Sequence, residues 1–131
     1  MINFTSKTNF QLRNKAALKS WIKKVVEKEG GQMKDLSFVF CDDMDLLDKN
    51  SKYLNLDTLT DILTFDYSEN NNISGDIYIS IDRVKENAKT YKVTFENELN
   101  RVMIHGVLHL LGYKDESEKE KYLEFIWLLK G

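Results

Sequence analysis

The sequence predicts an α+β (α/β-like) domain in which a small sheet is packed by helices. Short segments of alternating apolar residues lie in the middle of the chain, whereas apolar residues at helical spacing dominate both ends. The 131 residues match the size of one domain, so we expect residues 1–131 to form a single unit. A hydrophobic content of 42% with 31% charged residues is ordinary for a soluble protein.

The first half of the chain is expected to contain a long helix, a strand and a short helix. Apolar residues recur at helical spacing over residues 8–28, and a glycine pair ends that helix. Residues 35–42 alternate between apolar and polar, which predicts a strand. The acidic segment 42–50 predicts a small helix before a polar loop.

The second half predicts two further strands, over residues 60–67 and 76–81, with a loop between them. Asp82 is expected to cap a helix, and Thr94 to cap the next one, whose first turn holds Glu96 and Glu98, two acids that the helix dipole favours there. A capping box at Ser117 predicts a last helix, so five helices are expected.

Nothing in the chain indicates secretion or a membrane. No apolar run approaches the roughly 18 residues that a membrane span needs, and the amino terminus lacks the pattern of a signal peptide. The single cysteine, Cys41, lies in a predicted strand and has no second cysteine to pair with. We therefore expect a reduced, cytoplasmic protein.

Charge is distributed unevenly, although the net charge is only −2. Residues 1–28 hold seven basic residues against the single acid Glu27, a net charge of +6, which leaves −8 for the remainder. Such a segment can form a patch that faces the phosphates of a nucleic acid, with Lys19 and Lys23 among its candidate contacts. It is more often the solvated side of an amphipathic helix.

The two histidines, His105 and His109, stand four residues apart in the helix predicted to begin at Thr94. Residues at i and i+4 share one helix face, so both imidazoles can reach one metal ion, as in many zinc sites. Beyond the glycine that ends the helix, Asp115 is the first acid able to fold back as a third ligand, with Glu116 and Glu118 behind it. Two histidines and a carboxylate leave a position open for water, which is typical of catalytic zinc.

A metal ion lowers the pKa of its bound water to near 7, so hydrolysis is the natural reaction class. Peptidases of the H-E-x-x-H type use the glutamate as general base, but Gly106 stands at that position here. This counts against a protease, although another acid could enter from a strand. The motif by itself predicts a metal-dependent hydrolase.

The segment HGVLHLLGYKD resembles the H-G-x-L-H-L-x-G-Y-D-H signature of the YbeY family, bacterial rRNA maturation factors regarded as metal-dependent, single-strand-specific endoribonucleases. Three further segments are similar to that family in the same order: TDILTF (60–65), GDIYIS (75–80) and FENELNRVMIHG (95–106). The resemblance covers most of the chain. It implies a small, mostly parallel four-stranded sheet with one antiparallel strand, packed by about five helices, with the metal site on the penultimate helix.

The resemblance also implies a ligand set. Two metal histidines of the family fall on His105 and His109, and His105 is a candidate catalytic position. The third family ligand is a histidine, and the matching residue here is Asp115. Because aspartate can bind zinc, one zinc ion is the expected cofactor. A carboxylate also makes the site harder, so manganese and iron are further candidates.

The family commonly has an arginine before its T-D segment, and Leu54 occupies that position here. Such an arginine would bind phosphate or stabilise developing negative charge. Lys52, Lys114 and Arg101 are candidates to supply that charge instead, and the sequence does not select among them.

Three polar residues have competing explanations. Asp61 either lines the metal cleft, with a catalytic role, or caps a turn before its strand. Asp76 can be a substrate-binding acid, but glycine-aspartate pairs commonly mark turns, and the turn is favoured. Asn50 matches a family asparagine and binds either backbone or substrate.

Together these features predict a metallo-endoribonuclease that cleaves single-stranded RNA in rRNA maturation and ribosome quality control. Its expected partners are rRNA and the ribosome or its small subunit, and a monomer is favoured. Two alternatives remain: a metal-dependent hydrolase of a peptide or small ester, and a non-catalytic ribosome-assembly factor that needs its metal only to fold.

Overall fold

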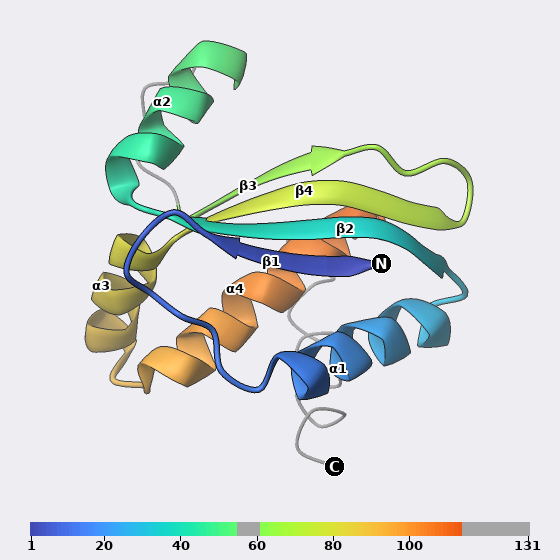
Figure 1. Cartoon of the computed structure of the whole chain (residues 1–131), viewed down its shortest axis with the longest axis horizontal. Helices are drawn as coiled ribbons and strands as arrows, with labels where there is room; N and C mark the ends of the chain where they lie inside the picture. The colour runs from blue at the N-terminus through green and yellow to red at the C-terminus, as the bar shows by residue number, and fades with distance from the viewer. Residues whose placement is uncertain (55–60, 114–131) are drawn as a thin grey trace.

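Four strands and four helices make up the part of the chain that the computed structural model describes (Figure 1). That part comprises residues 1–54 and 61–113, with side chains described for residues 1–49 and 61–113. The elements are β1 (Ile2–Ser6), α1 (Lys15–Lys28), β2 (Gln32–Cys41), α2 (Asp43–Leu54), β3 (Ile62–Asp66), β4 (Asn72–Ser80), α3 (Ile81–Tyr91) and α4 (Phe95–Leu110). Within these ranges no helix is both long enough and apolar enough to cross a membrane.

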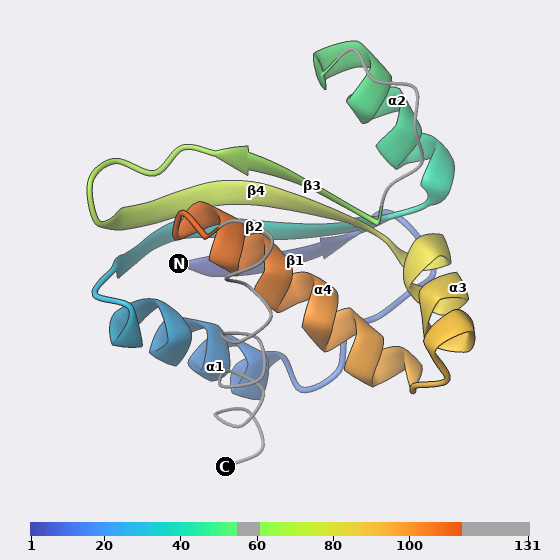
Figure 2. The same ribbon diagram turned by 180° about the vertical axis from the view of Figure 1, so that it is seen from behind.

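The strands form one sheet in the order β1-β2-β4-β3. Strands β1, β2 and β4 run parallel, and β3 pairs with β4 in the antiparallel direction. Helices α1 and α4 cover one face of this sheet, with α3 beside the start of α4, while α2 lies at one end of the other face (Figures 1 and 2). The predicted α+β class and mostly parallel four-stranded sheet are therefore confirmed. The fifth predicted helix, which begins at Ser117, lies outside the described residues.

The main core lies between the sheet and helices α1 and α4. Alternate strand residues point into it, and Leu36, Phe38 and Phe40 of β2 are at most 1% exposed, as the alternation predicts. A smaller cluster lies on the opposite face of the sheet, where Cys41 and Leu63 pack beneath Leu46 of α2. Burial, reinforced by nearby aspartates, raises the pKa of the Cys41 thiol to about 12.

The amino-terminal part of the chain differs from the prediction. Residues 2–6 form β1, which the sequence did not reveal because only two apolar side chains, Ile2 and Phe4, mark its inner face. Helix α1 begins at Lys15 rather than near residue 8. The preceding segment is a connection anchored by Phe10, whose ring packs edge-on against Phe40 at 5.2 Å.

Strand β4 begins at Asn72, so the predicted turn at Gly75 and Asp76 is wrong. Gly75 is needed for close packing inside the strand, since a Cβ there would lie 2.6 Å from the carbonyl oxygen of Phe65. The residue that caps the start of α3 is Ser80 rather than Asp82, because the Ser80 hydroxyl accepts a hydrogen bond from the backbone amide of Arg83, in the first turn of the helix.

Candidate metal centre

Helix α4 carries both histidines across the sheet. Thr94 caps its start as predicted, since the Thr94 hydroxyl accepts a hydrogen bond from the Asn97 amide at 3.1 Å. Further along, the helix packs tightly on the sheet at Gly106. A Cβ on Gly106 would lie 2.9 Å from Cδ1 of Ile77 and 3.0 Å from Cδ1 of Ile62. The missing side chain therefore allows this close contact, and the position has no room for a catalytic glutamate.

The rings of His105 and His109 lie next to each other. Their centroids are 4.5 Å apart and their planes are inclined by 48°. His105 is partly buried and His109 is exposed. Two imidazoles so placed fit the ligand set of a shared metal ion, which neutral ring nitrogens bind well.

The third predicted ligand, Asp115, lies outside the described residues. Among the described residues, no group of three or more histidine, cysteine or acidic side chains could hold a metal ion. The structure therefore brings together two of the three predicted ligands, and the third stays a prediction.

An ion-pair array extends along the same face of α4 toward its start. Arg101 donates to both carboxylate oxygens of Glu98, from Nε at 2.9 Å and from Nη2 at 2.8 Å. The Glu98 side chain is only 2% exposed, whereas that of Arg101 is 34% exposed. Nη2 of Arg101 also lies 3.4 Å from Oδ2 of Asp61, and Nδ2 of Asn87 lies 3.4 Å from the same oxygen. The array links α3, α4 and the residue preceding β3.

This array bears on two of the predicted catalytic residues. Arg101 precedes His105 by one helical turn, so Asp61 lies beside the histidine face of α4. Arg101 itself shares its charge between two carboxylates, which makes it better suited to hold Asp61 in place than to supply the charge that the resemblance implies near position 54. The remaining candidates for that charge, Lys52 and Lys114, lie outside the described side chains.

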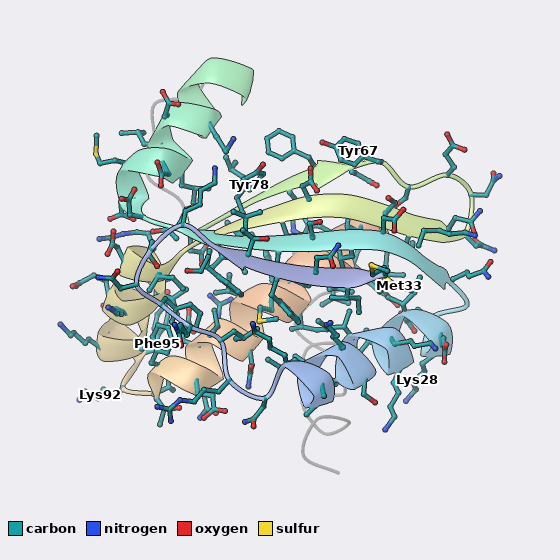
Figure 3. All side chains as sticks on the ribbon, viewed as in Figure 1. Lys28, Met33, Tyr67, Tyr78, Lys92 and Phe95 are labelled. Atoms are coloured by element: carbon teal, nitrogen blue, oxygen red, sulfur yellow. The ribbon has the colours of Figure 1, made fainter. Side chains whose placement is uncertain are left out.

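The predicted substrate-binding residues are not all near the histidines. Asp76 points to the opposite face of the sheet, where the Tyr67 hydroxyl donates to it at 3.2 Å, and both Tyr67 and Tyr78 lie on that side (Figure 3). Lys19 and Lys23 are exposed on α1. The side chain of Asn50 is outside the described part.

The buried ion pair predicts an asymmetric loss of stability. Arg101→Ala leaves the Glu98 carboxylate buried without its cation and should lower the free energy of unfolding by about 3 kcal/mol. Glu98→Ala leaves a partly exposed arginine beside Asp61 and should cost about 1.5 kcal/mol. Glu98→Leu added to Arg101→Ala should restore part of the loss. Urea unfolding of wild type, the two single alanine variants and the double variant measures these losses. An Arg101→Ala variant as stable as wild type would contradict the ion pair between Arg101 and Glu98.

The family is established by comparison with known proteins. A family profile described as endoribonuclease YbeY matches residues 1–124, which include every element described above and the histidine pair. The chain belongs to the YbeY endoribonuclease family. The resemblance read from the sequence motifs is thereby confirmed.

Relatives cover nearly the whole of this YbeY-family chain. Proteins described as endoribonuclease YbeY from Flavobacterium psychrophilum and Karelsulcia muelleri are 50% and 51% identical to it over 123 residues. Each alignment covers 94% of this chain, and 88% and 87% of the respective relatives. The solution structure of TM1509 from Thermotoga maritima superimposes with a TM-score of 0.71 at 28% identity, covering 98% of this chain and 89% of that one.

Proposed function

We propose that this protein is a metallo-endoribonuclease that cleaves single-stranded RNA in rRNA maturation and ribosome quality control. The observation that carries the proposal is the match to the YbeY family over residues 1–124. Relatives about half identical to this chain are described as endoribonucleases. The paired imidazoles of His105 and His109 support the metal dependence.

In this proposal His105, His109 and Asp115 hold one zinc ion, with manganese or iron as alternatives. When bound, the ion supplies Lewis-acid activation of the phosphodiester or of a water molecule. The packing of Gly106 on Ile77 fixes α4, which carries the first histidine, close to the sheet. A rigid helix is a suitable support, because catalytic groups must be held within a fraction of an ångström.

Asp61 contacts Arg101, which lies one turn before His105 on α4, and this supports a role for Asp61 in the site. Two donors, Arg101 and Asn87, approach a single oxygen of its carboxylate and limit its rotation. A carboxylate oriented in this way can accept a proton or orient a water molecule. We assign Asp61 that role, with Arg101 and Glu98 as the residues that position it.

The proposed partners are rRNA and the small ribosomal subunit in the cytoplasm, with the protein acting as a monomer. Exposed basic side chains on α1, including Lys19 and Lys23, supply positive charge for the phosphate backbone. Lys23 also lies 4.0 Å from Glu27, a solvent-exposed pair that RNA phosphates can replace at little cost.

The test is an assay of untagged protein on one RNA sequence, presented both single-stranded and as a duplex. We expect bound transition metal by elemental analysis, cleavage of the single strand alone, loss of cleavage with a chelator and recovery when metal is added back. Protein that contains no metal, or cleavage that a chelator leaves unchanged, would refute the metal-dependent mechanism. Absence of cleavage by metal-loaded, folded protein would favour the assembly factor.

A further inference from the structure

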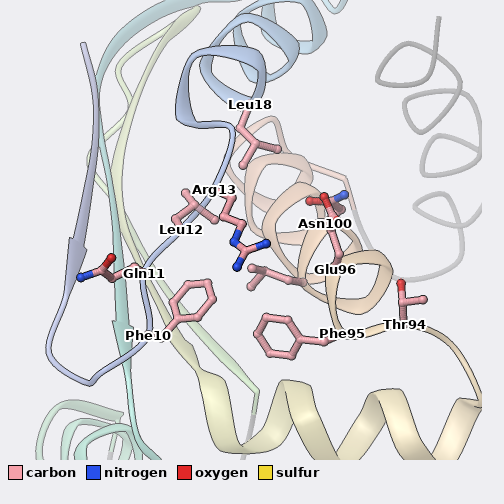
Figure 4. A pocket seen from close by; sticks show the side chains of 10 residues that line it. Phe10, Gln11, Leu12, Arg13, Leu18, Thr94, Phe95, Glu96 and Asn100 are labelled. Atoms are coloured by element: carbon pink, nitrogen blue, oxygen red, sulfur yellow. The ribbon is translucent and has the colours of Figure 1, made fainter.

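A cavity of about 350 Å³ opens between the start of α1, the start of α4 and the connection from β1 to α1 (Figure 4). Its lining combines an apolar and a polar set of side chains. The apolar set is Phe10, Leu12, Leu18, Phe95 and Leu99, and the polar set is Gln11, Arg13, Thr94, Glu96 and Asn100. The volume lies within the range of about 300–1,000 Å³ that small-molecule sites occupy.

This cavity is separate from the histidine site. His105 follows Glu96 by nine residues, and His109 follows Asn100 by the same number, which is about two and a half turns at roughly 3.6 residues per turn. Residues so spaced lie on opposite sides of a helix. Glu96 and Asn100, the polar residues that α4 contributes to the cavity together with Thr94 just before it, therefore lie on the side of the helix opposite the histidines.

The cavity pairs aromatic surface with positive charge. The rings of Phe10 and Phe95 meet edge-on, with centroids 5.5 Å apart, at one end of it. Arg13 extends between these rings and α4 (Figure 4), and it makes no ion pair with another described residue, although Glu96 lines the same cavity. A neighbouring hollow of about 540 Å³ shares Phe10, Arg13 and Phe95 and adds a second cation, Lys85.

We propose that this cavity binds one unpaired nucleotide of a single-stranded RNA. The base would lie among the apolar side chains, and its phosphates would contact Arg13 and Lys85. The amides of Gln11 and Asn100 and the carboxylate of Glu96 can accept or donate hydrogen bonds at a base edge. The proposal rests on the proposed ribonuclease function and adds a structural reason for a single-strand preference, because a paired, stacked base cannot enter a cavity.

Charge favours RNA as the occupant over an uncharged small molecule. The segment 1–28, which contains Arg13 and α1, carries a net charge of +6 in a protein of net charge −2. An RNA strand leaving the cavity along α1 meets Lys15 and Lys19, which are exposed. Single-strand binding proteins commonly combine such a basic track with aromatic side chains that contact bases.

The proposal is tested by titrating ¹⁵N-labelled protein with uridine or adenosine 5′-monophosphate and recording amide shifts. We expect shifts at residues 10–13 and 94–100. Arg13→Gln should weaken nucleotide binding about tenfold, the loss of a charge-assisted hydrogen bond, while leaving nucleoside binding little changed. Asn100→Phe should fill the cavity and abolish both. Lys34→Gln, an exposed change on β2, is the matched control and should bind as wild type does.

Absence of shifts in both segments, or shifts confined to the histidine region, would overturn the subsite. Wild-type affinity in a folded Arg13→Gln variant would do the same, and this surface change should not disturb folding. RNA cleavage by the same preparations separates the two proposals. Cleavage without nucleotide binding in the cavity would refute the subsite alone, whereas nucleotide binding without cleavage would support the subsite and count against the ribonuclease.

Discussion

His109→Ala should reduce cleavage of single-stranded RNA by at least about 100-fold, because loss of even an indirect partner of a metal site costs up to that factor. The fold should survive. His109 is exposed, so its removal creates no cavity in the core, and the metal-free protein should lose no more than about 1 kcal/mol of its free energy of unfolding.

Cleavage by wild type and His109→Ala should be compared after identical purification, since a contaminating nuclease would act equally in both samples. Thermal unfolding with and without added zinc supplies a second measurement. Zinc should raise the melting temperature of wild type and have little effect on the variant, because only wild type keeps both of the proposed imidazole ligands. Equal cleavage by both proteins would show that the reaction does not take place at the histidine site. A wild-type protein that is folded and binds metal but cleaves no RNA would favour the alternative of a non-catalytic ribosome-assembly factor.

Strong periodicity made most of the fold predictable. The alternation in β2 and β4 identifies their buried faces, and the spacing of His105 and His109 identifies the face of α4 that a metal would occupy. These features depend on local geometry alone. A period of two or of 3.6 residues can be read without knowing which element packs against which.

Features that depend on contacts between distant segments could not be predicted in the same way. Gly75 was interpreted as a turn residue, but its role is to admit the Phe65 backbone and the Leu110 side chain, which come from other elements. Glu98 was seen only as a favourable residue near a helix start, although its position three residues before Arg101 is the spacing of an ion pair. That spacing signals a pair, but only the packing of α4 shows that the carboxylate is buried.

Gly106→Glu, the substitution that would create an H-E-x-x-H motif, should unfold the protein or come close to it. The glutamate Cβ would lie within 3.0 Å of two isoleucine side chains, and the rest of the side chain would enter the core between α4 and the sheet. Overpacking costs about 1–3 kcal/mol. An unpaired carboxylate in an apolar core adds several more, against a typical total stability of about 5–15 kcal/mol. Gly106→Ala should lose less, because the contacting atoms are the ends of side chains and alanine has the higher helix propensity by about 1 kcal/mol.

Urea unfolding of Gly106→Glu, Gly106→Ala and a matched control, Asn97→Glu, measures this order. Asn97 is exposed on the same helix, so a glutamate there should change stability by about 0.5 kcal/mol or less. A Gly106→Glu variant as stable as the control would show that α4 does not pack on Ile77 as described. The expected order gives a physical reason why this histidine pair does not belong to an H-E-x-x-H peptidase: α4 lies so close to the sheet that the position after His105 has no room for a glutamate side chain. A general base in place of that glutamate would have to come from another position, and Asp61, which Arg101 contacts, is the residue that we propose.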